Sequence, residues 1–271
     1  MIDVSLGRRW RAVTRRATMA KSEFLPLGGG DALRQFLILF GCYVVYDLAR
    51  ALARGRDEVA LANGRAVMNL EKALHVYVEP WIQAKVSHVG ALVTFFNFFY
   101  INAHLTVMIG VLLWLYVKRN EYYLFCRNWF LLMNGLAVTA FALVPTAPPR
   151  LLPTSGMVDT MYLFSSSNLR GGTMGWLANP YAAVPSLHFG YALFASLVVY
   201  FLARGVWPRR LAVAYPFVVL LSIVGTGNHF LFDALGGALV AIAAYLLTLK
   251  FSLEPADEPL LVLNRGRAAG R

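Results

Sequence analysis

The hydrophobic positions of this chain gather into six long apolar stretches. Each is about 19 to 24 residues long and is bounded by charged residues or by Pro and Gly, and roughly 20 mostly apolar residues are enough for one helix to cross a bilayer. A crossing helix also satisfies its own backbone hydrogen bonds, which hydrocarbon cannot do. The pattern therefore predicts six membrane-spanning helices, at about residues 34–53, 96–118, 121–144, 184–204, 208–226 and 229–251.

The segment 57–87, between the first two apolar stretches, has mixed polarity. It carries two glutamates, Glu71 and Glu79, and several basic residues among Leu, Val and Trp, a pattern typical of an amphipathic helix on the membrane interface. Residues 89–95 are apolar and either extend the second span or form a short re-entrant piece. The predicted fold is an all-α integral membrane protein with six transmembrane helices plus an interfacial amphipathic helix between spans one and two.

The composition agrees with a membrane protein. The chain is 58% hydrophobic and 14% charged, with a mean hydropathy of +0.57, which lies outside the range of soluble domains. Its formal charge of +11 comes from basic residues that flank the apolar stretches, so the positive-inside rule explains it and no nucleic-acid partner is expected. The two cysteines are isolated from each other and from other ligand residues, so neither a disulfide framework nor a metal site is predicted.

Six spans place both termini on the same side of the membrane. Of the 25 Lys and Arg residues, 17 then fall on that side and 8 on the other, which predicts cytoplasmic termini in the plasma membrane or an equivalent membrane. The loop 145–183 and the turn 226–229 then face the periplasm, the exterior or a lumen. The chain divides into a basic cytoplasmic tail (1–33), a membrane domain (34–252) and a C-terminal cytoplasmic tail (253–271).

Ionisable residues gather where three predicted helices reach the outer side. Arg150 follows the third span, His188 lies at the start of the fourth, and His229 and Asp233 lie at the start of the sixth. Polar groups at such positions are costly, so they are candidates for function. His104, in the second span, is instead interpreted as a buried hydrogen-bonded histidine rather than a third catalytic base.

The residue types of this cluster suit phosphoryl transfer. His229 and Asp233 are four residues apart, so on a helix they share one face, and the carboxylate can hold one imidazole nitrogen as a donor while the other keeps its lone pair. His188 can donate a proton to a leaving alkoxide. Arg150 can bind phosphate oxygens, and the helix start near His188 adds N–H groups that favour an anion. The cluster predicts a site that needs no metal ion and no cofactor.

Each member of the cluster has an ordinary structural explanation when it is taken alone. A single histidine at a helix end is usually a packed or interfacial residue, and Arg150 can be a simple headgroup anchor. A transporter would use the same polar groups as an ion pathway. Their joint placement at one face, and the lack of a visible inverted repeat, favour an enzyme.

Two runs in this region carry a family resemblance. One reads Ala-Val-Pro-Ser-Leu-His over residues 183–188, and the other reads Gly-Thr-Gly-Asn-His-Phe-Leu-Phe-Asp over residues 225–233. Together they resemble the second and third signature motifs of the type 2 phosphatidic acid phosphatase (PAP2) superfamily. Pro-Ser-Leu-His, with the Ala-Pro-Pro-Arg run before it, is similar to the branch that includes inositol phosphorylceramide synthase and sphingomyelin synthase. The resemblance covers residues 120–250 well.

The resemblance implies a phosphohistidine mechanism. His229 attacks phosphorus, Asp233 orients it, and His188 protonates the departing group and then activates the acceptor. The chain departs from the hydrolase pattern, because Leu143 and Ile223 stand where a Lys and an Arg are expected. With those cations missing, the predicted phosphate-binding residues are Arg150, Asn228, Ser186 and Arg170.

A site with less positive charge favours a phosphodiester over a phosphomonoester, because the diester carries one negative charge less. The predicted function is therefore a membrane lipid phosphotransferase that moves a phosphate-bearing head group, such as inositol phosphate, between lipids. The alternative is a PAP2-type lipid phosphate phosphatase that uses water as acceptor, on a phospholipid or polyprenyl phosphate. A transporter is a distant third. The sequence predicts no oligomeric state.

Overall fold

The computed structural model describes residues 29–52, 55–164 and 181–253, and within these ranges the chain is helical with no strand. Most of the two predicted tails, and the predicted phosphate ligand Arg170, lie outside the described residues. The helices in chain order are α2 (Gly29–Leu52), α3 (Asp57–Ala73), α4 (Glu79–Ser87), α5 (Gly90–Lys118), α6 (Asn120–Leu143), η1 (Pro149–Leu151), η2 (Pro153–Ser155), α7 (Thr160–Phe164), α8 (Leu187–Leu202), α9 (Val206–Gly225) and α10 (Leu231–Leu253).

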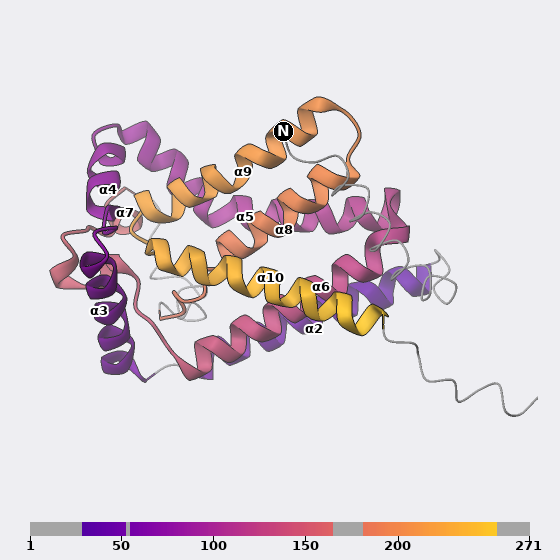
Figure 1. The fold of residues 1–271 in the computed structure, drawn as a ribbon, viewed down its shortest axis with the longest axis horizontal. Helices are drawn as coiled ribbons and strands as arrows, with labels where there is room; N and C mark the ends of the chain where they lie inside the picture. The colour runs from indigo at the N-terminus through magenta and orange to yellow at the C-terminus, as the bar shows by residue number, and fades with distance from the viewer. Residues whose placement is uncertain (1–28, 53–54, 165–180, 254–271) are drawn as a thin grey trace, which may run out of the picture.

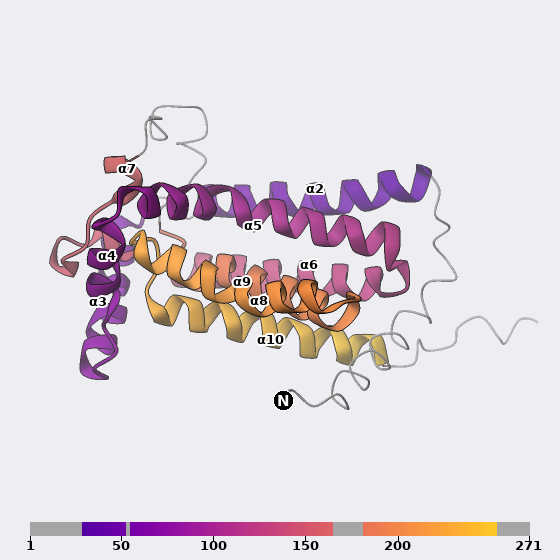
Figure 2. The ribbon, with the colours of Figure 1, turned by 90° about the horizontal axis from the view of Figure 1, so that it is seen from above.

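Six long helices, α2, α5, α6, α8, α9 and α10, lie side by side in a bundle (Figure 1). Helix α3 lies across one end of this bundle, and the view from above shows α4 and α7 at the same end (Figure 2). The start of α2 and the end of α10 lie at the opposite end in both views. The short helices α3, α4 and α7 therefore gather at one end of the bundle.

Four of the described helices are long and apolar enough to cross a membrane, namely α5, α6, α9 and α10. Helix α8 is equally apolar but has 16 residues, and α2 carries charged residues such as Asp31 and Asp47. Large apolar side chains on the outside of the bundle, including Phe98, Phe217 and Leu239, are more than half exposed, as lipid-facing residues are. The described part of the chain is thus all-helical with four candidate spans, and the count of six stays a prediction.

The core of the bundle lies between α5, α6, α8 and α10 and is rich in aromatic residues. Trp129 is almost fully buried, packs edge-on against Phe194, and donates a hydrogen bond from Nε1 to the Ala241 carbonyl at 2.7 Å. Helices α8 and α10 approach closely at Gly237, where a methyl group would overlap the Ser186 carbonyl oxygen. These contacts hold the starts of α8 and α10 next to each other.

The predicted amphipathic helix over 57–87 is two helices. Helix α3 ends in a Schellman motif: His75 takes a positive φ of 59°, its N–H bonds the Lys72 carbonyl, and the Val76 N–H bonds the Glu71 carbonyl. Pro80 then lies in the first turn of α4, where a missing N–H has no cost. Residues 89–95 extend the second span, because α5 begins at Gly90.

Candidate functional site

The three segments predicted to carry chemistry meet at the α3 end of the bundle. The Thr146 N–H donates to the Tyr181 carbonyl at 2.8 Å and the Thr146 carbonyl accepts from the Ala183 N–H at 3.1 Å, so the loop after α6 runs beside the segment before α8. The Ser186 N–H donates to the Asp233 carbonyl at 2.8 Å, which joins that segment to α10. Backbone hydrogen bonds thus bring the three segments together.

His229 and Asp233 are in contact, although His229 lies just before α10 rather than within it. The Nδ1 atom of His229 is 3.2 Å from Asp233 Oδ2 and 3.1 Å from the Ala183 carbonyl oxygen. Asp233 Oδ2 also accepts the Phe230 N–H at 2.9 Å, which is half of a capping box that starts the helix. Two acceptors therefore face Nδ1, so this nitrogen carries the proton and Nε2 keeps its lone pair.

His188 lies in the first turn of α8, beside His229. The two imidazole ring centroids are 5.5 Å apart. Tyr100 of α5 stacks on the His188 ring with centroids 4.2 Å apart, and the His104 ring is also 4.2 Å away. The predicted hydrogen bond of His104 is present, from Nδ1 to the Tyr100 carbonyl at 3.0 Å. Its position against His188, and that of Tyr100, were missed by the sequence interpretation.

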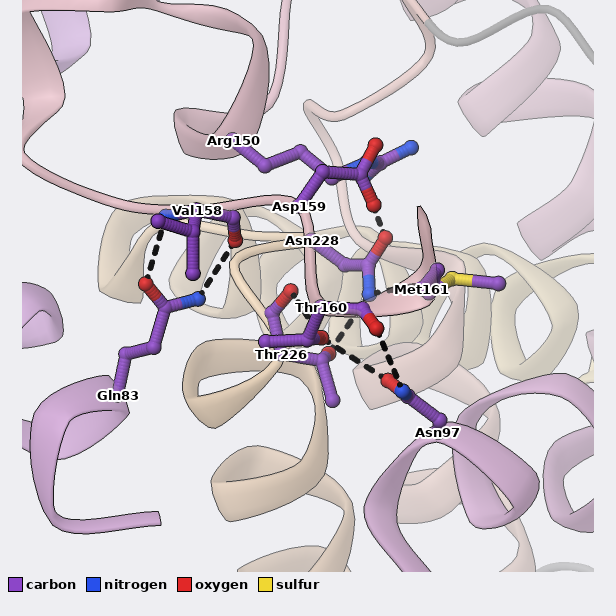
Figure 3. Close-up of polar contacts among 9 residues, drawn as sticks. All are labelled: Gln83, Asn97, Arg150, Val158, Asp159, Thr160, Met161, Thr226 and Asn228. Carbon is purple, nitrogen blue, oxygen red and sulfur yellow. Dashed lines mark hydrogen bonds and ion pairs between the residues drawn. The ribbon is translucent and has the colours of Figure 1, made fainter. Parts of the chain in front are cut away.

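Arg150 lies in the short helix η1 and reaches the turn that precedes His229 (Figure 3). Its Nη1 donates to Asn228 Oδ1, and its Nε is 3.4 Å from Asp159 Oδ2. Asn228 is buried and is oriented by a 2.6 Å hydrogen bond from Nδ2 to Thr226 Oγ1. The Arg150 guanidinium therefore contacts the side-chain amide of Asn228, the residue that directly precedes His229.

The surroundings of Asn228 form a buried polar network (Figure 3). Thr160 Oγ1 donates to Asn97 Oδ1 at 3.0 Å, and Asn97 Nδ2 donates to the Thr160 carbonyl at 3.1 Å. Gln83 of α4 pairs with the backbone of Val158 in the same reciprocal way, at 2.8 and 2.9 Å. These bonds attach the segment 158–160 to α4 and α5, so the partner carboxylate of Arg150 is held in place.

Two glutamates of the amphipathic segment reach the start of α10. The Leu231 N–H donates to Glu79 Oε1 at 2.9 Å and the Phe232 N–H donates to Glu71 Oε1 at 2.8 Å. Both glutamates are completely buried. Burial and a hydrogen bond with Glu79 raise the pKa of Glu71 to about 9, and burial raises the pKa of the neighbouring Tyr77 to about 12. No local sequence pattern indicates this contact.

The comparison with protein families agrees with these motifs. A family model described as the PAP2 superfamily matches residues 65–247, about two thirds of the chain. The chain belongs to the PAP2 superfamily. The matched range contains His188, His229, Asp233 and Arg150, and it also contains α3 from residue 65 onward and all of α4.

A curated relative narrows the similarity within the PAP2 superfamily. The chain is 28% identical over 201 residues to a protein named phosphoinositol dihydroceramide synthase from Bacteroides thetaiotaomicron. The match covers 66% of this chain and 64% of the relative, so the chain spans less than two thirds of the relative's length. No solved structure matches the chain. The family match and this similarity agree with the resemblance of the two motifs to PAP2 and to its inositol phosphorylceramide synthase branch.

The structure also shows where the missing cations of the PAP2 pattern would lie. Leu143 ends α6 and is 70% exposed, and Ile223 of α9 is fully buried in an apolar cluster to which α8 and α10 also contribute. Ser186, predicted to bind phosphate, is fully buried, and its Oγ has no hydrogen-bond partner among the described residues. Of the predicted phosphate ligands that the structure describes, Arg150 is the single cation.

Proposed function

We propose that this PAP2 enzyme transfers a phosphate-bearing head group, such as inositol phosphate, from a phospholipid to a lipid acceptor through a phosphohistidine intermediate. The observation that supports the proposal most directly is that two acceptors, the Asp233 carboxylate and the Ala183 carbonyl, lie within hydrogen-bond distance of His229 Nδ1. It fixes the tautomer whose Nε2 lone pair is nucleophilic. The nearby His188 ring, 5.5 Å between centroids, supplies a second proton carrier.

In the first half-reaction, His229 Nε2 attacks phosphorus and the bond from phosphorus to the glycerol oxygen of the donor lipid breaks. His188, protonated, gives its proton to that oxygen, so a neutral alcohol leaves. The new phosphorus–nitrogen bond places a positive charge on the His229 ring, and the buried Asp233 carboxylate beside Nδ1 stabilises it.

In the second half-reaction, the acceptor is the hydroxyl group of another lipid. The now neutral His188 takes the proton of this hydroxyl, the oxygen attacks phosphorus, and the bond to His229 Nε2 breaks. Both histidines return to their starting protonation states. The same intermediate would yield a free phosphorylated head group if water entered instead, so the acceptor alone separates a transferase from a hydrolase of the same diester.

The charge of the site favours a phosphodiester. Arg150, the single described cation among the predicted phosphate ligands, lies 3.4 Å from the Asp159 carboxylate, which offsets its charge. A monoester dianion would need more compensation than a diester monoanion requires. The similarity to a phosphoinositol dihydroceramide synthase supports inositol phosphate as the head group and a ceramide-like alcohol as the acceptor.

The same proposal includes the orientation in the membrane. The start of α2 and the end of α10 lie at the end of the bundle opposite the site (Figure 1). With 17 of the 25 Lys and Arg residues on the side of the termini, the positive-inside rule favours a site that faces the periplasm, the exterior or a lumen.

The test is turnover by the purified protein in detergent. Phosphatidylinositol labelled in its inositol is supplied with and without dihydroceramide, and wild type is compared with His229→Ala and with a matched control, His88→Ala, at an exposed histidine after α4. We expect a new labelled lipid from wild type and the control and none from His229→Ala. Labelled inositol phosphate without a new lipid would indicate a hydrolase that uses water as acceptor, and no product with any acceptor would contradict the proposal.

A further inference from the structure

The carboxyl groups of Glu71 and Glu79 end at the first turn of α10, which directly follows His229. Three consecutive backbone N–H groups at this start, those of residues 230, 231 and 232, each donate to a different carboxylate. The first N–H groups of a helix have no partner within the helix and carry its positive dipole end, so buried anions there are stabilising. Asp233 is local, whereas the two glutamates come from 152 and 161 residues away.

The second carboxylate oxygen of each glutamate indicates whether the two side chains can both be charged. Oε2 of Glu71 and Oε2 of Glu79 are both buried, and no other described group hydrogen-bonds to them. Two adjacent buried carboxylates would repel each other and leave two acceptors without donors. One proton between them removes both costs, because the protonated carboxyl donates to the ionised one. The pKa of Glu71, raised by burial and by a hydrogen bond with Glu79, agrees with this arrangement.

We propose that Glu71 and Glu79 share one proton and act as a positioning pair, which holds the start of α10 where His229 meets the substrate phosphate. The pair touches neither substrate nor reacting atoms. It acts through the backbone of Leu231 and Phe232, which follow His229 directly in the chain. The proposal rests on the proposed function, because the aligned histidine matters only if it reacts.

Among the described residues, few other ionisable groups act on this pair. Tyr77 lies in the turn between α3 and α4. Burial, and the negative charge of the glutamates, raise its pKa to about 12, so its hydroxyl stays neutral over the pH range in which Glu71 titrates. Lys72 of α3 lies over the Tyr77 ring, with 5.0 Å from Nζ to the ring centroid. From α10, the Asp233 carboxylate raises the pKa of Glu71. Loss of the shared proton is therefore opposed by a neighbouring negative charge.

The shared proton makes the stability of the folded protein fall as pH rises. The pKa of Glu71 rises from the ordinary glutamate value of 4.5 to about 9 in the folded protein, so the folded state binds more protons than the unfolded state between these values. The stability that the proton provides is complete below pH 4.5 and is lost as pH rises toward about 9. Above that pH both carboxylates are charged, and the start of α10 is held less well.

Glu71→Gln is the decisive variant. Its Oε1 can still accept the Phe232 N–H, and its amide N–H can donate to Glu79, as the protonated carboxyl does. We expect this variant to keep kcat within about threefold of wild type at pH 7 and to lose the alkaline decline of both kcat and melting temperature. Glu71→Ala removes the hold on the helix, and we expect kcat to fall about 10- to 100-fold, with KM changed by less than about threefold, because misplacement affects the reacting geometry.

The experiment measures kcat, KM and melting temperature of the purified full chain from pH 6 to about pH 10, with Glu58→Gln on the exposed face of α3 as the matched control. Superimposable pH profiles for wild type and Glu71→Gln would overturn the shared proton, and wild-type kcat in Glu71→Ala would overturn the positioning role. If Glu71→Ala does not fold, the Glu71→Gln profiles still decide. If no lipid is turned over at all, the proposed function fails, while the melting profiles test the proton independently.

Discussion

The Asp233→Asn substitution tests how much the site depends on a negative charge beside His229. In the proposed mechanism the His229 ring becomes positively charged once Nε2 is bonded to phosphorus, while Asp233 Oδ2 lies 3.2 Å from Nδ1. Unit charges at this distance attract by about 5 kcal/mol at an effective dielectric constant of about 20. An amide oxygen retains part of that attraction, so we expect a loss of about 3–4 kcal/mol of transition-state stabilisation, on the order of 10²–10³-fold in kcat.

The hydrogen-bond geometry limits the loss to this range. The Ala183 carbonyl also accepts from His229 Nδ1 at 3.1 Å, so the nucleophilic tautomer survives when the carboxylate becomes an amide. An amide oxygen can still accept the Phe230 N–H that Asp233 Oδ2 accepts. The amide nitrogen then takes the place of Oδ1, which is buried and has no partner among the described residues. An unpaired buried donor costs about 1–3 kcal/mol of folding stability.

The assay is the initial rate of labelled-lipid turnover at saturating substrate, with the melting temperature of each protein recorded in the same detergent. Asp57→Asn, in the exposed first turn of α3 at the same end of the bundle, is the matched control. A kcat of Asp233→Asn within about threefold of wild type would refute the reasoning, because the charge would then contribute less than 1 kcal/mol. A loss as large as that of His229→Ala would show instead that the Ala183 carbonyl does not hold the tautomer.

Three further substitutions probe other parts of the site. We expect His188→Ala to lower kcat about 10²–10⁴-fold on a lipid donor, but to form the phosphoenzyme at close to the wild-type rate with a p-nitrophenyl phosphodiester, whose leaving group needs no proton; equal losses with both donors would contradict the acid role. Arg150→Lys should raise KM for the lipid donor about tenfold, because a lysine cannot contact Asn228 and Asp159 as the planar guanidinium does. An unchanged KM would exclude Arg150 from phosphate binding. Gly237→Ala should destabilise the protein by about 1–3 kcal/mol, since the methyl overlaps the Ser186 carbonyl, whereas Gly135→Ala on α6, with nothing within 4 Å of a new Cβ, should not; thermal unfolding in detergent measures both.

Apolar periodicity predicted the bundle well because the long helices carry apolar side chains both in the core, such as Trp129, and on the outside of the bundle, such as Phe217 and Leu239. The helices fall close to the predicted ranges, from Gly29–Leu52 to Leu231–Leu253. The interfacial segment was predicted less well. Its interruption comes from a left-handed residue at His75 and from Pro80, and histidine is not a residue whose presence predicts a helix end.

The neighbourhood of His229 shows where local patterns stop being informative. The spacing of His229 and Asp233 indicated one helix face, yet the helix begins two residues after the histidine, at Leu231. The contact between them survives because Asp233 folds back to the helix start and accepts the Phe230 N–H. Motif resemblance identified the residues without a correct helix boundary, since both arrangements place the carboxylate next to Nδ1.

Glu71 and Glu79 could not be placed from the sequence, because their partners are backbone N–H groups more than 150 residues away. Glutamates among apolar residues ordinarily lie on the solvent-exposed face of an amphipathic helix, whereas these two are buried. Because these glutamates are buried, the amphipathic segment packs against the end of the bundle. In the proposed role it also helps to position His229. The PAP2 match begins at residue 65, after α2 but before both glutamates. The part of the chain that matches the family therefore includes the proposed positioning pair together with the histidines, as expected if the two belong to one catalytic unit.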